Sequence, residues 1–295
     1  MKKTLLAVAT LLAVGAVQAD TLSKIKETGA VTMGVRESSG LSYTLGDGKY
    51  VGYHIDVCQK VISDIRKKLG LSSLTIKYQP VTSQNRIPLV QNGTVDIECG
   101  STTNNLARQK DVAFAVTTYV EEVRTAVKAD SGISSISQLA GKTIATTTGT
   151  TSVQTLRKHE RANGIDFKEV FGKDHADSFL LLESGRADAF VMDGSILAKN
   201  IATSKNPAGF KIVGEVLSVE PIAIMLRKDD PAFKAAVDDS IKAQIKSGEL
   251  AKTYDKWFLQ PIPPTNAKIG LPLSGATKAA WANPNDKPME DYAKR

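Results

Sequence analysis

The chain has 295 residues, of which 42% are hydrophobic and 23% charged, and its formal net charge is +7. This composition is that of a globular protein with room for one large domain or two of medium size. Its basic residues are spread along the chain and aromatic residues make up only 6%. A nucleic-acid-binding protein would show a basic stripe or stacking aromatic residues, so we expect no nucleic-acid partner.

Residues 1–19 have the three-part pattern of a secretory signal. Lys2 and Lys3 precede an almost wholly apolar run, 5–17, and small residues lead to a cleavage point after Ala19. The apolar run is shorter than the roughly 20 residues that span a bilayer, and no later stretch is apolar enough to do so. We therefore predict a signal peptide over 1–19 and a soluble, periplasmic mature protein.

The first part of the mature chain alternates between strand and helix patterns, as expected for a parallel sheet with covering helices. Apolar residues at helical spacing mark the longest helix, and Gly70 ends it. In chain order, we expect a helix over 20–30, a strand over 31–35, a turn at 46–48, a helix over 53–69, a strand over 74–78, a helix over 83–92 and a strand over 95–99.

A second region repeats this alternation. Residues 89–101 and 181–195 both run from an apolar helix end through Gly and Asp into a strand and then into polar residues. The repetition predicts a second α/β lobe of the same design. Its expected elements are a strand over 143–146, a helix over 153–163, a strand over 166–170, a helix over 178–184, a strand over 188–192 and a helix over 194–201.

Two extended segments are expected to join the lobes. Residues 113–128 and 213–227 are rich in β-branched residues, which favour strands. Two further helices, over 231–247 and 248–258, would follow the second crossing, and Pro261 to Pro264 is expected to end regular structure. The predicted domains are lobe 1 over 20–120 and 222–270, lobe 2 over 121–221, and a C-terminal surface segment over 271–295.

The cysteines and histidines give little sign of metal chemistry. Cys58 and Cys99 are the only two cysteines. In an oxidising compartment they are candidates for a disulfide, and two buried free thiols are equally compatible with the sequence. The three histidines, at positions 54, 159 and 175, have no metal-ligand spacing, so we expect no metal and no cofactor.

Polar residues gather where the predicted strands end. The run STTNN (101–105) follows one strand and has Arg108 behind it, Arg36 follows another, and Thr151 and Asp193 occupy such positions in the second lobe. Ligands of open parallel sheets bind beyond the carboxyl ends of the strands. Since a guanidinium can grip a carboxylate with two hydrogen bonds, the pattern indicates an anionic ligand between the lobes.

Several longer stretches resemble the polar amino-acid substrate-binding proteins of periplasmic ABC transporters, in particular the members that bind acidic amino acids. The resemblance spans essentially the mature chain and implies a two-lobe periplasmic binding-protein fold of α/β class. Such a fold has parallel-rich sheets, a hinge of two extended crossovers and a ligand in the interlobe cleft. The stretches are GVRESS (34–39), TSQNRIPLVQNGTVDIECGSTTNN (82–105), GTTS (149–152), KDHADSF (173–179), LESGRADAFVMD (182–193), MLRKDDP (225–231) and KWF (256–258) with PIPP (261–264).

The resemblance also implies a function and a set of roles. The protein would be a monomer that captures L-glutamate or L-aspartate and delivers it to a membrane permease driven by an ATPase. Arg108, with Thr103 and Thr151, would hold the α-carboxylate, and Asp193 the α-ammonium group. The side-chain carboxylate would be held by Arg36, Ser83, Arg86 and His175, with Ser101 bordering the site.

The charges fit this interpretation, although each residue has an ordinary alternative. The three arginines and Asp193 give a net charge of about +2, or about +3 with a protonated histidine, which suits a ligand of net −1. Alternatively, the arginines are solvated, His175 lies in a surface turn and Asp193 is a helix N-cap.

Other functions must be weighed as well. Another polar amino acid, such as glutamine, is the first alternative ligand, and a dehydratase built on the same fold is less favoured. We expect no enzyme, because the chain has neither G-x-S-x-G nor G-x-x-x-x-G-K-[ST]. A membrane-bound sensor would need a spanning segment after the second lobe, and we expect none.

Overall fold

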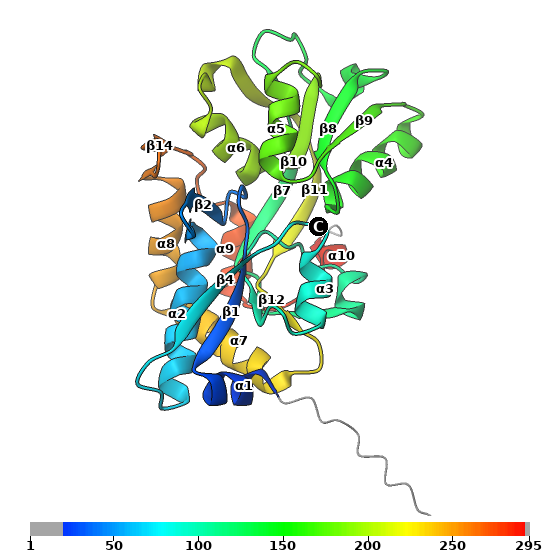
Figure 1. The fold of residues 1–295 in the computed structure, drawn as a ribbon. Coiled ribbons are helices and arrows are strands. Elements are labelled where there is room, and N and C mark those ends of the chain that lie inside the picture. Colours follow the sequence, from blue (N-terminus) through cyan, green and yellow to red (C-terminus); the bar gives the residue numbers. More distant parts are fainter. Residues whose placement is uncertain (1–19, 293–295) are drawn as a thin grey trace, which may run out of the picture.

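The alternation of strand and helix patterns builds two five-stranded sheets, one in each of two α/β lobes (Figure 1). The computed structural model describes residues 20–292. The predicted signal peptide, residues 1–19, lies outside the described residues. Within the described residues, no helix has the length and apolar character needed to cross a membrane.

The first sheet has the strand order β4-β1-β5-β12-β6, and we call this sheet with its helices lobe 1. β1 pairs in parallel with β4 and β5, whereas β12 pairs antiparallel with β5 and β6. The strands are β1 (Ala30–Val35), β4 (Thr75–Pro80), β5 (Ile97–Glu98), β6 (Val112–Phe114) and β12 (Met225–Arg227), with a hairpin of β2 (Tyr43–Gly46) and β3 (Lys49–Val51).

The helices of lobe 1 bury a largely apolar face. Their bounds are α1 (Thr21–Thr28), α2 (Tyr53–Lys68), α3 (Arg86–Gln91), α7 (Pro231–Lys246) and α8 (Glu249–Phe258), with a 3₁₀ turn η1 (Arg108–Lys110). Aromatic rings from α2, α8 and the first crossing strand meet in the core: Tyr254 and Phe258 stack with centroids 4.3 Å apart, and Tyr119 stacks on Phe258 at 5.6 Å. Such pairs add to the stabilisation that burial of their area provides.

The second sheet has the strand order β11-β7-β10-β8-β9, and we call it with its helices lobe 2. β8 pairs in parallel with β9 and β10, and β7 pairs antiparallel with β10 and β11. Its elements are β7 (Tyr119–Lys128), η2 (Ile136–Leu139), β8 (Thr143–Thr147), α4 (Thr151–Asn163), β9 (Lys168–Gly172), α5 (His175–Glu183), β10 (Ala189–Asp193), α6 (Gly194–Thr203), η3 (Pro207–Gly209) and β11 (Phe210–Ile222).

The internal repetition expected from the sequence is confirmed. The unit β1-α2-β4-α3-β5 of lobe 1 corresponds to β8-α4-β9-α5-β10 of lobe 2, and in each sheet the first strand of the unit lies between the second and the third. Some boundaries differ: α4 begins at Thr151 rather than 153, and α5 begins at His175 rather than 178. The surface turn considered for His175 is therefore wrong, because this residue opens a helix.

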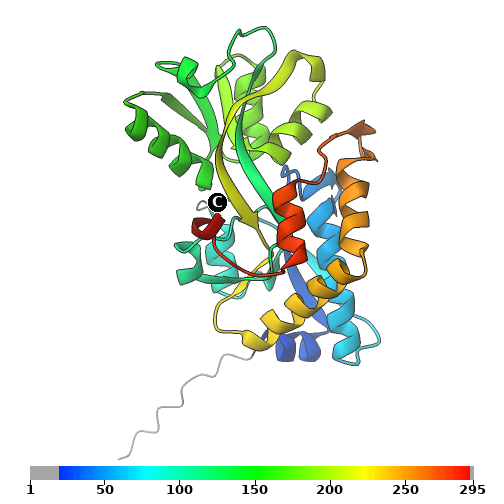
Figure 2. The same cartoon turned by 180° about the vertical axis from the view of Figure 1, so that it is seen from behind.

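Two long strands connect the lobes. β7 and β11 pair antiparallel and run from lobe 1 into lobe 2 (Figures 1 and 2). At the lobe 1 end, the Thr118 N–H donates to the Ile222 carbonyl, and Thr103 forms an isolated bridge with Ile222. The lobe boundaries proposed near 120 and 221 fall within these shared strands, and they remain predictions.

The expected end of regular structure at 261–264 is wrong. β13 (Pro261–Ile262) pairs with β14 (Ala267–Lys268), and α9 (Gly275–Ala282) and α10 (Met289–Tyr292) follow. Ser274 caps α9 by accepting from the Thr277 N–H, and Trp281 packs against the lobe 1 core. The helices were missed because they have only eight and four residues, α9 is rich in alanine and α10 has no buried residue, so neither shows a helical periodicity.

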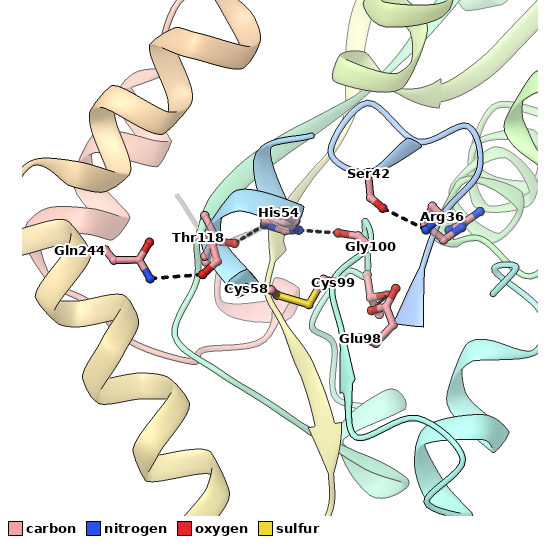
Figure 3. Close-up of a disulfide and its surroundings, with 11 residues drawn as sticks. Arg36, Ser42, His54, Cys58, Glu98, Cys99, Gly100, Thr118 and Gln244 are labelled. Carbon is pink, nitrogen blue, oxygen red and sulfur yellow. Dashed lines mark hydrogen bonds between the residues drawn. A yellow bond between two sulfur atoms is a disulfide. The ribbon is translucent and has the colours of Figure 1, made fainter. Parts of the chain in front are cut away.

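A disulfide joins Cys58 of α2 to Cys99, the residue after β5 (Figure 3). The sequence left this bond open, and the structure contains it. Beside the disulfide, the His54 ring lies between the Thr118 hydroxyl, 2.7 Å from Nε2, and the Gly100 carbonyl, which Nδ1 contacts. The disulfide and His54 therefore fix the start of the polar run that follows β5.

Candidate functional site

The site lies between the lobes, at the carboxyl ends of their parallel strands. A small polar cavity lies there and is almost filled by the surrounding side chains. Seven of the nine residues named from the sequence line it, while Arg36 and Arg108 lie just outside the lining. The lining residues are Ser83, Arg86, Ser101, Thr103, Thr150, Thr151, His175, Met192 and Asp193.

Arg86 is the buried cation of this cavity. It is the first residue of α3 and only 2% exposed. One Nη donates to the Ser101 carbonyl at 3.2 Å, but among residues 20–292 its Nε has no hydrogen-bond partner, nor do the hydroxyls of Ser83 and Ser101. Burial and the neighbouring Arg108 lower the pKa of Arg86. Since unpaired buried donors are costly, this group of side chains favours an anionic partner.

Arg36 is fully buried directly after β1 and reaches across to lobe 2. Its Nη2 donates to Asp174 Oδ1 at 2.6 Å, and the Ser38 hydroxyl donates to the other oxygen of Asp174. Burial alone would raise the pKa of Asp174, but Arg36, His175 and Ser38 outweigh it and bring the pKa down to about 2. Within the described residues, Arg36 Nε and Nη1 have no partner, so this guanidinium also has donors left for an anion.

His175 is neutral in this site. Burial, followed by the positive charge of Arg36, lowers its pKa to about 3. Its Nε2 lies 3.1 Å from Arg36 Nη2, and its Nδ1 lies 3.0 Å from Thr147 Oγ1. A guanidinium can only donate, so Nε2 accepts from Arg36 and the ring proton lies on Nδ1. The additional positive charge considered for this histidine is therefore absent.

Thr103 and Thr151 meet at a carboxylate that sequence reasoning missed. Their hydroxyls donate to Glu220 Oε2 at 2.6 and 2.7 Å, and Ser218 donates to Glu220 Oε1 at 2.7 Å. Arg108 lies at the edge of this group, where Nη1 donates to the Thr103 carbonyl at 2.8 Å. The hydroxyl hydrogen of each threonine is donated to Glu220, so each hydroxyl oxygen can only accept a hydrogen bond from a ligand.

Asp193 ends β10 and is the N-cap of α6, yet its side chain makes no capping hydrogen bond. Burial, together with Glu121 and Glu220, raises the pKa of Asp193 well above its usual range. A carboxylate in such surroundings is stabilised by a nearby cation. The N-cap alternative is correct for the backbone position but does not describe what the side chain does.

The charge count made from the sequence was incomplete. Asp174 pairs with Arg36, and the buried Glu98, Glu121 and Glu220 also lie near the cavity. Glu121 and Glu220 face each other directly in the β7–β11 ladder, and burial raises the pKa of Glu121 to about 7. Glu121 and Glu220 were overlooked because they lie on the crossing strands, whereas Glu98 and Asp174 lie within the quoted stretches but were given no role. A charged residue within the apolar run VEPIAIM was the available signal for Glu220.

Two glycines allow the lobes to touch around the cavity. A Cβ at Gly40 of lobe 1 would lie 2.7 Å from the Ser195 carbonyl oxygen of lobe 2. A Cβ at Gly149 of lobe 2 would lie 2.9 Å from the Cα of Gln84 in lobe 1, and Gly149 also has φ of +79°. Neither approach leaves room for a side chain, so glycine at both positions lets the lobes come this close, and the Arg36–Asp174 ion pair joins the lobes there.

A polar cavity between two repeated α/β lobes, joined by two strands, defines a two-lobe solute-binding protein. Comparison with known families agrees: residues 31–260 match the bacterial extracellular solute-binding proteins, family 3, and the chain belongs to this family. The expected two-lobe fold is therefore confirmed, as is the expectation of a binding protein rather than an enzyme. The family's extracellular location agrees with export, while the signal peptide itself remains a prediction.

Relatives and solved structures extend this result. The chain is 45% identical over 270 residues to the glutamate/aspartate import solute-binding protein of Escherichia coli strain K12, covering 91% of this chain and 89% of the relative. It is 45% identical over 272 residues to the L-glutamate/L-aspartate-binding protein of Pseudomonas aeruginosa strain PAO1, covering 92% and 90%. A mutant of ArgBP from T. maritima superposes with a TM-score of 0.70 at 27% identity, covering 80% of this chain and 98% of that protein.

Proposed function

We propose that this protein binds L-glutamate and L-aspartate between its lobes and delivers them to an ABC importer. The observation that carries the proposal is the pair of buried guanidiniums with unpaired donors, Arg36 and Arg86, together with a cavity lined by both Arg86 and the buried Asp193. An amino acid with a second carboxylate presents one cation and two anions, and this arrangement offers partners for each. The names of the two relatives support the same ligands.

The side-chain carboxylate is assigned to the lobe 1 cations. Arg86 Nε, the Ser83 hydroxyl and the two unpaired donors of Arg36 are available to it. Neutral His175 contributes by accepting from Arg36 and fixing the plane of that guanidinium. This assignment keeps the residues named from the sequence but gives the histidine a positioning role instead of a direct bond to the ligand.

The α-ammonium group is assigned to Asp193 together with the oxygens of Thr103 and Thr151. Because both hydroxyls donate to Glu220, they suit an ammonium donor better than the α-carboxylate to which they were first assigned. The α-carboxylate is left to Arg108, the third cation around the cleft and one that lies next to lobe 2, 3.5 Å from the Gly149 carbonyl.

Discrimination follows from these pairings. Glutamine fills the same volume as glutamate but presents an uncharged amide to Arg36 and Arg86. A buried charge without a counter-charge is penalised, so glutamine should bind at least a hundredfold more weakly, about 3 kcal/mol. Aspartate differs from glutamate by one methylene, which changes affinity by only about 1–3 kcal/mol.

The test is calorimetric titration of unfolded, ligand-stripped and refolded mature protein with L-glutamate, L-aspartate and L-glutamine. We expect tight binding of both acids and weak binding of glutamine. Tight binding of glutamine, or no binding of any of the three, would overturn the acidic specificity. Chromatography of the recovered ligand checks that it is unchanged, since conversion would favour a dehydratase.

Delivery and cellular setting extend the proposal. Membership in a family of extracellular solute-binding proteins, and the word import in the name of a relative, support a permease with its ATPase as the partner. We further propose that the protein acts as a periplasmic monomer. Light scattering of the mature protein with and without glutamate tests the oligomeric state.

A further inference from the structure

The C-terminal strap, which we define as residues 283–292, lies outside the part of the chain that matches the family, residues 31–260. It follows α9 and ends in α10, and in Figure 2 it crosses the face of lobe 1 to reach the lower end of β11. The strap is thus an addition to the common fold, placed where the lobes join.

The strap holds the ligand loop, which we define as residues 99–108. The buried Asn104 side chain donates to the Asp286 carbonyl at 2.8 Å, and the Met289 N–H donates to the Asn104 carbonyl at 2.9 Å. The Leu106 N–H donates to Glu290 Oε2 at 3.1 Å. Asn104 directly follows Thr103, so these bonds grip the loop next to the site.

The same strap holds the lobe 1 end of the hinge. The Thr117 N–H, two residues before β7 begins, donates to the Asn285 carbonyl at 2.9 Å. Just before the strap, Trp281 Nε1 donates to the Thr118 carbonyl at 2.9 Å. Asp286 pairs with Lys234 of α7 at 3.0 Å. Each of these partners belongs to lobe 1 or to the start of β7, so the strap joins the ligand loop and the hinge root into one unit.

The ligand loop is anchored at its start and in its middle, and the Asn104 N–H also donates to the Pro221 carbonyl of β11 at 2.9 Å. Its first residues are fixed by the Cys58–Cys99 disulfide and by His54 at the Gly100 carbonyl. Its middle has no such covalent tie, and the strap supplies further bonds there. Within the loop, the Asn105 side chain accepts from the Arg108 N–H, and the Arg108 side chain donates to the Thr103 carbonyl. Holding 104–106 thus holds Thr103 and Arg108 as well.

We propose that the strap is a positioning element that sets Thr103 and Arg108 for the α-amino-acid part of the ligand. The inference rests on the proposed function, in which these residues meet the groups that every amino acid shares. The strap therefore raises affinity for glutamate, aspartate and glutamine by the same factor. Selectivity among them stays with Arg36, Arg86 and Ser83, which the strap does not touch in the bonds described above.

The test uses the full chain with two side-chain ties removed, Asn104→Leu and Glu290→Ala. Asn163→Leu with Glu160→Ala is the control, because in lobe 2 these two residues give the same kinds of bond, amide to carbonyl and backbone N–H to carboxylate. The Asn104 side chain is buried and also binds Lys287 and Gln109, so Asn104→Leu removes those bonds as well. We expect the strap variant to bind all three amino acids about tenfold more weakly, through faster dissociation, and the control to stay within about twofold.

Hydrogen exchange separates positioning from a general loss of stability. Amide exchange should rise in residues 103–108 of the strap variant and stay unchanged at Ser101, whose carbonyl accepts from Arg86, and in β10 of lobe 2. Unchanged affinity, an altered glutamate-to-glutamine ratio, or exchange that rises equally in both lobes would overturn the proposal. If the double variant does not fold, Glu290→Ala alone should give about a threefold uniform loss, and no loss there would also overturn it. If the unaltered chain fails to bind the acids, the proposed function fails instead.

Discussion

The two lobes share one design and divide the charges unequally. Each carries a β-α-β-α-β unit with the first strand in the middle, and each places polar residues at the same three strand ends. Arg86 opens α3 in lobe 1, and the neutral His175 opens the corresponding α5 in lobe 2. The repeat thus fixes where functional side chains stand, while the residue at each position decides what the lobe does.

This comparison suggests an order of events. Lobe 1 holds Arg36, Arg86 and Arg108, so under the proposed function we expect the anionic groups of a ligand to meet this lobe first. Lobe 2 would then add Asp193 and its contacts with lobe 1, and β7 and β11, which pair along the connection, are where we expect any bending between the lobes. A ligand that satisfies both sets of charges favours the closed arrangement by its differential affinity for it.

The largest expected effect concerns the disulfide, which lobe 1 has and lobe 2 lacks. The chain has only Cys58 and Cys99, 41 residues apart, and cross-linking a loop of this length restricts the unfolded chain. We expect Cys58→Ala with Cys99→Ala to lower the free energy of unfolding by about 4 kcal/mol, measured by urea denaturation. Reducing the unaltered protein should reproduce the loss. A change below about 1 kcal/mol would mean that the disulfide adds little to lobe 1.

The next effect tests the buried cation of lobe 1 against an exposed cation of lobe 2. Arg86→Ala should weaken glutamate binding by about 3 kcal/mol, more than a hundredfold, because the side-chain carboxylate loses its buried partner. Glutamine should lose about tenfold or less. Arg157→Ala is the control, since Arg157 forms an exposed ion pair with Glu169 in lobe 2; calorimetry should find it unaffected. Equal losses for glutamate and glutamine would contradict the assignment of the carboxylate to Arg86.

Much of this architecture could be predicted from the sequence, because it depends on patterns among residues that are close in sequence. Strand and helix periodicities, with glycine at helix ends, act over a few residues, and the repeat of lobe 1 in lobe 2 reinforced them. The polar residues at strand ends led to Ser101, Thr103, Thr151 and Asp193 of the cavity lining, and the family resemblance added Ser83, Arg86 and His175. Periodicity did fail in the C-terminal segment, where α9 and α10 are short.

The missing parts depend on contacts between distant residues. Glu220 meets Thr103 across 117 positions of sequence, and Asp174 meets Arg36 across 138. No local sequence pattern indicates a contact between residues so far apart. Neither the ion pair of Arg36 with Asp174 nor the bonds from the Thr103 and Thr151 hydroxyls to Glu220 could therefore be predicted. The same limit hid the strap, because its bonds to Asn104 join positions about 180 residues apart.

A smaller effect is expected for the ion pair that joins the lobes. Asp174→Asn keeps the shape of the side chain but removes the negative charge that faces Arg36. The Asp174 side chain is one-fifth exposed, while that of Arg36 is fully buried. The closed state should lose about 1 kcal/mol, which weakens glutamine binding about fivefold. Glutamate should lose less, because Arg36 then has more charge to offer its carboxylate. Stopped-flow dissociation rates for both ligands check this, and a larger loss for glutamate would contradict it.

The smallest effect is a pH dependence that originates beneath the ligand loop. Burial lowers the pKa of His54 from 6.5 to about 4, although its bond to the Gly100 carbonyl acts in the opposite direction. In the unfolded chain His54 is protonated below about pH 6.5, whereas in the folded chain it is protonated only below about pH 4. Stability falls as pH drops through this window. Between pH 7 and pH 6, His54 should account for roughly 0.7 kcal/mol of that fall.

The variant His54→Gln isolates the contribution of His54. Glu121, whose pKa is raised to about 7 in the folded chain, makes stability rise as pH falls, but it is present in both proteins and so cancels in the comparison. Urea unfolding at pH 7 and pH 6 should give a pH-dependent loss of stability smaller in the variant by roughly 0.7 kcal/mol. His175, which faces the cavity from lobe 2, also has a lowered pKa. It is present in both proteins, so it contributes equally to the pH dependence of their stability. The same slope in both would mean that His54 titrates alike in the folded and unfolded chains, and hence that its burial between Thr118 and Gly100 does not exclude the proton.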